Sequence, residues 1–306
     1  MTPSGFILLD KMAGETSFKA LFPLKRVFCT KRVGHAGTLD LRASGLIVAA
    51  MGRATRLLPF VESKDKCYTF RLHLGYETDT LEWDGNVVEQ DSRDPQGVLG
   101  HLDRAALQSV LPNFTGDIEQ VPPRYSAIKV DGHRASDLAV RGREVELKSR
   151  AVTIHSLKVV GEGGVTEGCS GREFATFDLE CDCSKGTYIR SLGRDLARAL
   201  GTCGCVSQIR RHRIGDVTLE RAVRGDELKA SHLVPVNEVL NYPVVRLDGQ
   251  QMAVIRNGNW IPWKETPVGL DADCHVFAAN ENGEVLSLCR YEPGRLWPKV
   301  FLAEDD

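Results

Sequence analysis

The sequence lacks any long hydrophobic run. No apolar stretch approaches the roughly 20 residues that a membrane-spanning helix needs, although 42% of the residues are hydrophobic and 26% are charged. The first residues also lack a basic segment that leads into a long apolar core and a small-residue cleavage site. We therefore expect a soluble protein with no membrane partner, located in the cytoplasm.

Cysteine is too sparse and too irregular for a disulfide framework. The nine cysteines are odd in number and scattered along the chain, as is typical of core thiols in a reducing compartment. C-x-x-C motifs are missing, because the pairs Cys181/Cys183 and Cys203/Cys205 are each separated by one residue. We expect Cys181 and Cys183 to point to opposite faces of a strand, and we expect no metal centre.

The sequence also has little net charge. The formal value of −2 argues against non-specific binding of polyanions by the whole surface. The charges are segregated, however: residues 16–33 contain five basic residues and no acid, residues 183–213 contain seven basic residues and one acid, and residues 77–94 contain seven acids and one arginine. A basic face opposed to an acidic one fits a polyanion bound in a defined orientation, and solvated helix faces give the same pattern.

Internal repeats and low-complexity segments are missing, and 306 residues predict either one large domain with a small one or two domains. Hydrophobic periodicity predicts strands at 5–10, 46–50, 67–74, 151–160 and 174–183, and helices after 16–17, from Asp103 to Leu111, from Arg134 to near Gly142 and from Tyr188 to Leu200. In the last helix Arg190, Arg194 and Arg198 form a stripe. Short strands after Pro243 indicate a small β domain.

The most informative segment is Gly34-His35-Ala36-Gly37-Thr38-Leu39-Asp40, which precedes Gly45 and the apolar run Leu46–Ala50. Glycines allow a backbone to approach a ligand closely, and the run indicates a buried strand. Asp40 is therefore the first candidate for a working carboxylate. Spacing alone favours an ordinary turn in which the aspartate bonds its own backbone.

Five blocks of residues together resemble the TruB family of tRNA pseudouridine synthases. They stand in the family's order: Leu9-Asp10-Lys11 with Gly14-Glu15-Thr16-Ser17, Val33 through Asp40, Gly75-Tyr76-Glu77-Thr78-Asp79-Thr80, Pro122 through Lys129, and Cys183 through Arg190. The chain departs from the family where it has Met12 and Leu41 in place of prolines and Ser44 in place of threonine. We expect these departures to change the rigidity of the loop rather than its chemistry.

The resemblance implies an α/β (α+β) catalytic domain over residues 1–242, with the pseudouridine synthase fold and a mixed, largely antiparallel central sheet. It also implies an RNA-gripping insertion over roughly residues 121–146. Residues 243–306 resemble, more loosely, the small RNA-binding β domain of the PUA type. An RNA-gripping insert of this kind is expected to be mobile without RNA.

By the same resemblance, the chain isomerises uridine to pseudouridine, with uridine 55 in the tRNA T-loop as the target. The reaction breaks the bond from ribose C1′ to uracil N1 and joins C1′ to C5, so no redox cofactor or metal is expected and no cofactor is implied. Asp40 matches the essential carboxylate, which acts either as a nucleophile or as the trigger of glycosidic cleavage. Arg190 matches the arginine that pairs with it, and Tyr68 matches the tyrosine that stacks on the base and accepts a proton.

Six further residues are expected to bind substrate. Tyr188 and Ile209 match positions that line the base pocket, and His35 matches a histidine that supports the RNA loop once the uridine has left its stack. Lys11, Lys129 and Lys185 are expected to contact phosphates or the pocket. Each has an ordinary structural alternative, such as a core side chain or a solvated lysine.

The expected partner is the T stem-loop of tRNA, bound by a monomer that needs no other protein. Two other functions stay open on the sequence. One is a tRNA-folding chaperone whose catalysis is dispensable, and the other is a pseudouridine synthase that acts on a different RNA.

Overall fold

The computed structural model describes residues 4–126, 128–130, 133–134, 147–167, 173–264 and 274–303. By its internal contacts the chain forms two compact units. The first unit comprises Met1–Leu41, Gly45–Lys64 and Ile214–Asp306, and the second comprises Arg42–Ser44 and Asp65–Arg213. The domain boundary expected between residues 242 and 243 stays a prediction.

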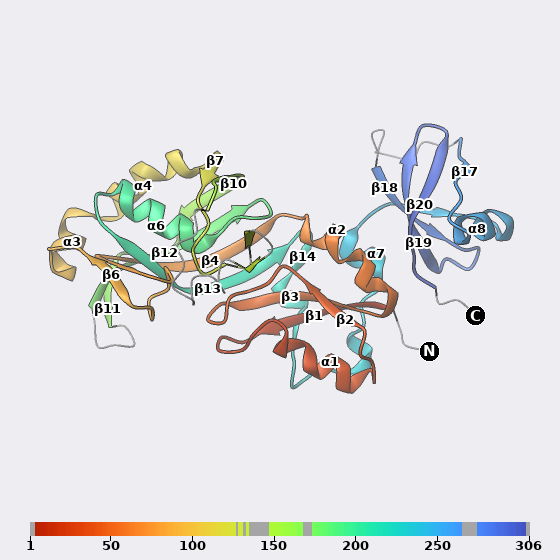
Figure 1. Cartoon of the computed structure of the whole chain (residues 1–306), viewed down its shortest axis with the longest axis horizontal. Helices are drawn as coiled ribbons and strands as arrows, with labels where there is room; N and C mark the ends of the chain where they lie inside the picture. The colour runs from red at the N-terminus through yellow and green to blue at the C-terminus, as the bar shows by residue number, and fades with distance from the viewer. Residues whose placement is uncertain are drawn as a thin grey trace. The chain divides into compact units, whose positions relative to one another are not determined.

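The first unit is built on a small mixed sheet around one buried strand (Figure 1). Strand β3 (Ser44–Met51) contains the predicted apolar run, and it pairs antiparallel with β1 (Gly5–Lys11) and β2 (Val33–Ala36). Strand β15 (Val223–Arg224) pairs parallel with β1. Between β1 and β2 the chain forms the 3-10 turn Lys19–Leu21 and helix α1 (Phe22–Val27). The first part of the segment Gly34–Asp40 belongs to strand β2.

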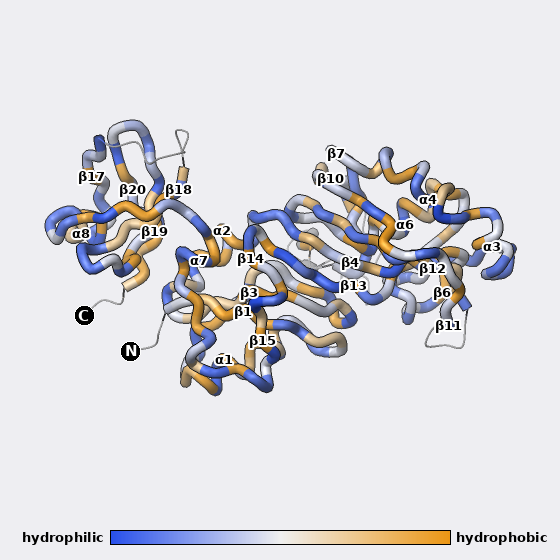
Figure 2. Tube along the Cα trace, turned by 180° about the vertical axis from the view of Figure 1, so that it is seen from behind, coloured by the Kyte–Doolittle hydropathy of each residue, from blue (hydrophilic) through white to orange (hydrophobic). Residues whose placement is uncertain are grey.

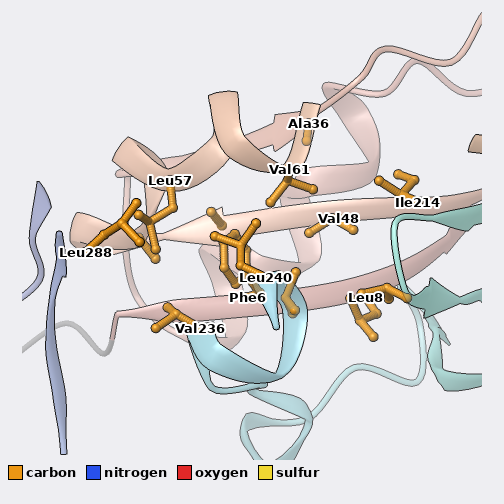
Figure 3. Close-up of a cluster of buried hydrophobic side chains, with 14 of the residues drawn as sticks. Phe6, Leu8, Ala36, Val48, Leu57, Val61, Ile214, Val236, Leu240 and Leu288 are labelled. Atoms are coloured by element: carbon orange, nitrogen blue, oxygen red, sulfur yellow. The ribbon is translucent and has the colours of Figure 1, made fainter. Parts of the chain in front are cut away.

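Helices cover this sheet and complete the core of the first unit. They are α2 (Leu58–Glu62), which follows the 3-10 turn Gly52–Leu57, and α7 (Val236–Leu240). Figure 3 shows Phe6 and Val48 on strands β1 and β3 together with Val61 of α2 and Leu240 of α7. All four side chains are almost fully buried. Burial of a large aliphatic or aromatic side chain contributes about 1.5–3 kcal/mol, so this cluster supplies much of the unit's stability.

The C-terminal part of the first unit is a five-stranded sheet in the order β16-β18-β19-β20-β17. Its elements are β16 (Val244–Arg246), α8 (Gly249–Arg256), β17 (Ile261–Pro262), β18 (Cys274–Ala279), β19 (Val285–Glu292) and β20 (Arg295–Phe301). Along the chain, β14 (Val217–Thr218) and the 3-10 turns Leu219–Arg221 and Ala230–His232 come before β16. Asp248 caps α8 by accepting a hydrogen bond from the Gln251 N–H, and the sheet has its own apolar cluster. The short strands predicted after Pro243 therefore form a sheet of their own, and their status as a separate domain stays a prediction.

The second unit has an antiparallel sheet whose long strands follow the predicted ones closely. Its order is β13-β4-β12-β10-β7, with β11 beside β12. The strands are β4 (Lys66–Leu74), β7 (Gly116–Gln120), β10 (Arg150–Val159), β11 (Gly164–Glu167), β12 (Glu173–Cys183) and β13 (Gly204–Ile214). In β4 Tyr68, Phe70 and Leu72 are buried, whereas Thr69 and Arg71 are half-buried, as the alternating sequence predicts. With the mixed sheet of the first unit, this confirms the expected α/β fold with largely antiparallel strands.

Two helices of the second unit begin at aspartate caps. Asp94 caps α3 (Pro95–His101), and Asp103 caps α4 (Arg104–Val110) by accepting a hydrogen bond from the Ala106 N–H. The 3-10 turn Leu111–Phe114 follows α4. Helix α6 (Ile189–Ala199) ends before Gly201, whose φ of +70° suits a left-handed cap.

Two short hairpins complete the second unit. They are formed by β5 (Tyr76–Thr78) with β6 (Val87–Gln90) and by β8 (Lys129–Val130) with β9 (His133–Arg134). Arg134 therefore lies in a strand, and the rest of the helix expected up to Gly142 lies outside the described residues. Most of the predicted RNA-gripping insertion lies outside them as well.

One expectation about the cysteines is wrong. Cys181 and Cys183 are both fully buried in β12, and their thiols interact with each other. Residues two apart in a strand share a face, so the expectation of opposite faces misapplied the two-residue period.

Among the described residues, no group of three or more histidine, cysteine, aspartate and glutamate side chains is placed to hold a metal ion. Nor does any described helix have the length and hydrophobicity needed to cross a bilayer.

Candidate active site

Asp40 lies half-buried in the loop between β2 and β3. The residue before it, Leu39, is fixed by a single side chain from the far end of the β1–α1 connection. The hydroxyl of Ser17 accepts a hydrogen bond from the Leu39 N–H at 2.9 Å and donates one to the Leu39 carbonyl at 3.0 Å. Ser17 is itself buried. The backbone on the N-terminal side of the carboxylate is therefore held in one conformation.

The residue after Asp40 is anchored as well. The carbonyl of Leu41 accepts a hydrogen bond from the Gly14 N–H at 2.8 Å and a longer one, at 3.4 Å, from the amine of Lys11. Lys11 is fully buried and also donates to the carbonyl of Met12. Lys11 thus holds the backbone on either side of the Asp40 loop, and its expected contact with a phosphate or the pocket stays a prediction.

The chain passes from the first unit to the second directly after Leu41. Within the second unit Arg42 forms an ion pair with Asp84 at 2.7 Å, and the hydroxyl of Ser44 accepts a hydrogen bond from Arg210 at 3.2 Å. The hydroxyl that Ser44 shares with the family's threonine is therefore engaged in a hydrogen bond in this chain. Asp40 thus lies on a short segment that is anchored on both sides.

Tyr68 is buried in the first half of β4, directly opposite Cys181 of β12. Burial raises the pKa of its hydroxyl above the usual value of 10.0, and Arg211 opposes that rise through its charge and a hydrogen bond. Arg211 is 1% exposed and is among the largest fully buried side chains in the described part of the protein. It was not predicted from the sequence, where the pair Arg210-Arg211 resembles ordinary surface charge.

Arg190 stands in the first turn of α6 and is also buried. Its guanidinium donates hydrogen bonds to the carbonyls of Thr80 and Tyr125 at 3.0 and 2.9 Å. These carbonyls belong to two of the sequence blocks that carry the family resemblance. Arg190 thus ties together the loop after β5, the segment after β7 and the start of α6, and it is not a member of a solvated helix stripe.

Tyr188 directly precedes α6, and Gln120 clamps its backbone on both sides. The Gln120 side chain accepts a hydrogen bond from the Tyr188 N–H at 2.7 Å and donates one to its carbonyl at 3.1 Å. Gln120 is almost fully buried at the end of β7. Sequence reasoning did not identify Gln120, because a lone glutamine carries no recognisable spacing.

The remaining predicted site residues are spread over both units. His35 is half-buried on β2 of the first unit. In the second unit Ile209 is buried on β13, Lys185 is exposed at the turn before α6, and Lys129 lies in β8, with its side chain outside the description. The substrate contacts assigned to these residues stay predictions.

The basic segment 183–213 and the acidic segment 77–94 contact each other directly. Arg198 of the helix stripe forms an ion pair with Glu77 at 3.0 Å, and Arg194 bonds to Asp195 and to the carbonyl of Val121. Burial raises the pKa of Glu77, and Arg198 counteracts this rise. Arg198 thus links α6 to the acidic segment.

The first unit supplies a carboxylate, Asp40, between two anchored residues. The second unit supplies a buried phenol beside a guanidinium and a buried arginine that organises a loop. The family profile described as "TruB family pseudouridylate synthase (N terminal domain)" matches residues 25–189, which include Asp40, Tyr68 and most of the other predicted site residues. The chain belongs to the TruB family of pseudouridylate synthases.

Relatives along the whole chain are more specific. A protein named tRNA pseudouridine synthase B from Caulobacter sp. (strain K31) is 43% identical over 97% of this chain and 96% of its own length. Another of that name from Thermobifida fusca (strain YX) is 38% identical over 98% of each chain.

Solved structures share the fold. A chain in the "Structure of H/ACA RNP bound to a substrate RNA containing 2'-deoxyuridine" aligns with a TM-score of 0.68 at 18% identity, covering 99% of this chain and 86% of its own. A chain in the "Crystal Structure of a Cbf5-Nop10-Gar1 Complex" aligns with a TM-score of 0.64 at 21% identity, covering 99% and 84%. At these identities the likeness defines the fold alone.

Proposed function

We propose that this protein is a tRNA pseudouridine synthase that converts uridine 55 of the T-loop to pseudouridine. Similarity to synthases named for tRNA along almost the full chain carries this proposal. It is supported by the presence of Asp40, Tyr68 and Arg190 at the family's motif positions. The T stem-loop is the proposed recognition element, since a stacked base must be flipped outward before its glycosidic bond is accessible.

In this mechanism Asp40 supplies the carboxylate that supports C1′ while its bond to N1 breaks. The carboxylate acts either by attack on the sugar or by triggering elimination, and the detached uracil turns before C5 joins C1′. A carboxylate held between two anchored residues needs little reorganisation, and such preorganisation is a main source of catalytic rate. We propose that Arg190 orients Asp40, as the family pattern implies.

The last step removes the proton from C5 after the new bond has formed. We propose that Tyr68, ionised to tyrosinate, accepts this proton on its oxygen and that its ring stacks on the base. Burial makes the tyrosinate costly, so a neighbouring positive charge is useful, and Arg211 provides one. Tyr188 and Ile209 would then retain the uracil, His35 would support the open RNA loop, and Lys129 and Lys185 would contact RNA.

The experiment that tests this function uses transcript tRNA that carries 5-³H-uridine, because replacement of the C5 hydrogen releases tritium. We expect one equivalent of tritium per tRNA and no free uracil. A transcript with cytidine at position 55 serves as the matched control and should release none. If the cytidine-55 transcript released tritium as fast as the uridine-55 transcript, position 55 would not be the target. Free uracil would show that the base is released and not isomerised.

The same preparation addresses the two other functions. A folding chaperone would raise the fraction of aminoacylatable tRNA without tritium release, whereas a synthase for another RNA would release tritium only from that RNA. A monomeric state and a cytoplasmic location also stay predictions. Sedimentation at micromolar concentration and fractionation of the cell would test them.

A further inference from the structure

Two large aromatic side chains are exposed on the segment that leads into α1. Phe18 is 58% exposed and Phe22 is 50% exposed, although neighbouring Leu21 and Leu24 are buried. The two rings meet edge to face, with centroids 5.7 Å apart and planes at 82°. Figure 2 shows the mixture of hydrophobic and hydrophilic residues along α1. The rings therefore form a paired outer surface and take no part in the core.

A lysine completes this surface. The amine of Lys25 lies 4.5 Å from the centre of the Phe18 ring and 5.2 Å from that of the Phe22 ring. Both distances are within the range of cation–π attraction, which favours this arrangement. The interaction orders two side chains that would otherwise rotate in solvent. We call Phe18, Phe22 and Lys25 the aromatic platform.

The charge around the platform indicates the occupant. Residues 16–33 contain Lys19, Arg26, Lys31 and Arg32 besides Lys25, and no acid. Aromatic rings among positive charges match a nucleobase with its phosphate, because the ring stacks and the cations attract the backbone. A stable protein interface needs about 800 Å² on each side with few charges at its centre. Two rings in a segment with five basic residues do not fit that description. A second copy that docked through the same segment would also meet like charge.

The platform is tied to the Asp40 loop within the same unit. Ser17 directly precedes Phe18 and holds both backbone polar groups of Leu39. On the other side, the hydroxyl of Thr16 accepts a hydrogen bond from the Lys19 N–H at 3.1 Å. The platform and the loop therefore share one support, and a nucleotide held by the platform has a defined place relative to Asp40.

We propose that the aromatic platform stacks an unstacked nucleobase of the RNA substrate, outside the pocket that receives the target uridine. This inference rests on the proposed function for the nature of the substrate. It assigns to Phe18 and Phe22 a binding role that the motifs do not include. The platform positions the RNA and takes no part in bond making.

The test measures equilibrium binding of unmodified transcript tRNA by filter retention at fixed salt, in an Asp40→Asn background that prevents turnover. The double variant Phe18→Ala/Phe22→Ala should bind roughly 5- to 100-fold more weakly, which is the range expected for loss of one stacked base. The double variant Phe18→Trp/Phe22→Trp should bind within about threefold of the parent. Val88→Ala, an exposed apolar change in the acidic segment, is the matched control and should not alter binding.

Leucine substitutions separate stacking from general hydrophobic contact. Phe18→Leu/Phe22→Leu keeps the apolar surface and removes the rings, so it should weaken binding as alanine does. Full binding by the leucine variant, or by a folded alanine variant, would overturn the proposal. A wild-type dimer that the alanine changes dissociate would also overturn it, because the rings would then bind a second copy. Circular dichroism and thermal melting confirm that each variant is folded.

The proposal and the proposed function fail in different ways. If the wild type releases tritium and the alanine variant binds tRNA as tightly as the parent, the stacking proposal is wrong and the proposed function stands. If the alanine variant binds tRNA more weakly and the wild type releases no tritium, the platform is an RNA contact and the proposed function is wrong. Cross-linking of transcripts that carry 4-thiouridine at single positions should then identify the stacked nucleotide.

Discussion

Ser17 and Leu39 are 22 residues apart, yet one hydroxyl satisfies both backbone polar groups of Leu39. The Ser17 hydroxyl accepts a hydrogen bond from the Leu39 N–H and donates one to the Leu39 carbonyl. It thus satisfies the two groups that a neighbouring strand would otherwise pair. The next residue along the chain is Asp40. The serine of the Gly14-Glu15-Thr16-Ser17 block therefore serves as a structural support for the segment that carries Asp40.

Replacement of Ser17 by alanine should lower kcat much more than affinity. The change leaves two buried backbone groups unpaired, and displacement of a catalytic group by about 1 Å costs about 10- to 100-fold in rate. We expect kcat to fall by that factor, with the Kd for tRNA within about threefold. Tritium release at saturating tRNA and filter binding measure the two quantities.

The matched control is Ser63→Ala, since the Ser63 hydroxyl donates to the Phe60 carbonyl at an exposed site of the same unit. Its activity should equal that of the wild type. An unchanged kcat in Ser17→Ala would show that the Asp40 loop does not depend on this support.

Arg211 should set the ionisation of Tyr68. Burial raises the pKa of the hydroxyl and Arg211 lowers it, so Arg211→Met should raise that pKa further, whereas Arg211→Lys should raise it less. The tyrosinate absorbance near 295 nm, taken as wild type minus Tyr68→Phe, isolates this group during an alkaline titration. We expect a transition above pH 10 in the wild type and a later one in Arg211→Met.

The activity of Arg211→Met should fall together with that shift, because a less accessible tyrosinate is a poorer proton acceptor. Equal titration of wild type and Arg211→Met would contradict a direct electrostatic link. Tyr68→Phe should abolish turnover, and a fully active Tyr68→Phe enzyme would remove Tyr68 from the proton transfer.

His73 should make the fold sensitive to acid. Burial, together with the charge of Arg71, lowers the pKa of His73 from 6.5 to about 4, whereas Asp178 acts in the opposite direction. The ring bonds to the Ser207 hydroxyl at 2.6 Å and packs on Trp83 and Phe174. The unfolded chain therefore binds the proton more readily. The stabilisation is complete above pH 6.5 and is lost as the pH falls towards 4.

The loss at pH 4.5 amounts to about 2–3 kcal/mol for a shift of this size. Urea unfolding at pH 7 and pH 4.5 measures it, with His73→Gln as the comparison because glutamine does not titrate. The decrease in the free energy of unfolding should be smaller in His73→Gln by about that amount. Equal decreases in both proteins would mean that His73 is not the titrating group.

Gln120 should matter for catalysis although it carries no charge. Gln120→Glu keeps an acceptor for the Tyr188 N–H but cannot donate to the Tyr188 carbonyl, and Gln120→Ala loses both bonds. An unpaired buried group costs about 1–3 kcal/mol, so both variants should melt several degrees lower. Turnover should also fall, since the start of α6 presents Arg190.

Gln108→Ala, an exposed change on α4, is the control for these melts. If Gln120→Ala melted and turned over like Gln108→Ala, the clamp on Tyr188 would be irrelevant to the site.

The sequence predicted the strands well because their patterns are local. The alternation from Cys67 to Leu74 and the run Leu46–Ala50 each appear within one element, and so do the cap at Asp103 and the stop at Gly201. Contacts between distant segments leave no such pattern. The pairing of Arg198 with Glu77 joins residues 121 apart, and nothing in the local sequence reveals it.

The departures from the family also acquire a physical reason. Met12 has a backbone N–H that proline lacks, and it donates to the Glu15 carboxylate at 3.2 Å. Leu41 gives up the ring constraint of proline, and its carbonyl, which proline would also have, is held by Gly14 and Lys11. Only the hydrogen bond from the Met12 N–H is one that the family's proline could not form. The sequence alone reveals the lost prolines but not this hydrogen bond.

The central claim is that Asp40 performs the isomerisation in tRNA. The most direct measurement compares the wild type with Asp40→Asn in single-turnover tritium release from transcript tRNA, with filter binding on the same preparations. We predict complete release by the wild type, none by Asp40→Asn, and tRNA affinities within a few fold of each other. Substantial release by a pure Asp40→Asn protein would contradict the account, because another group would then have to break the glycosidic bond.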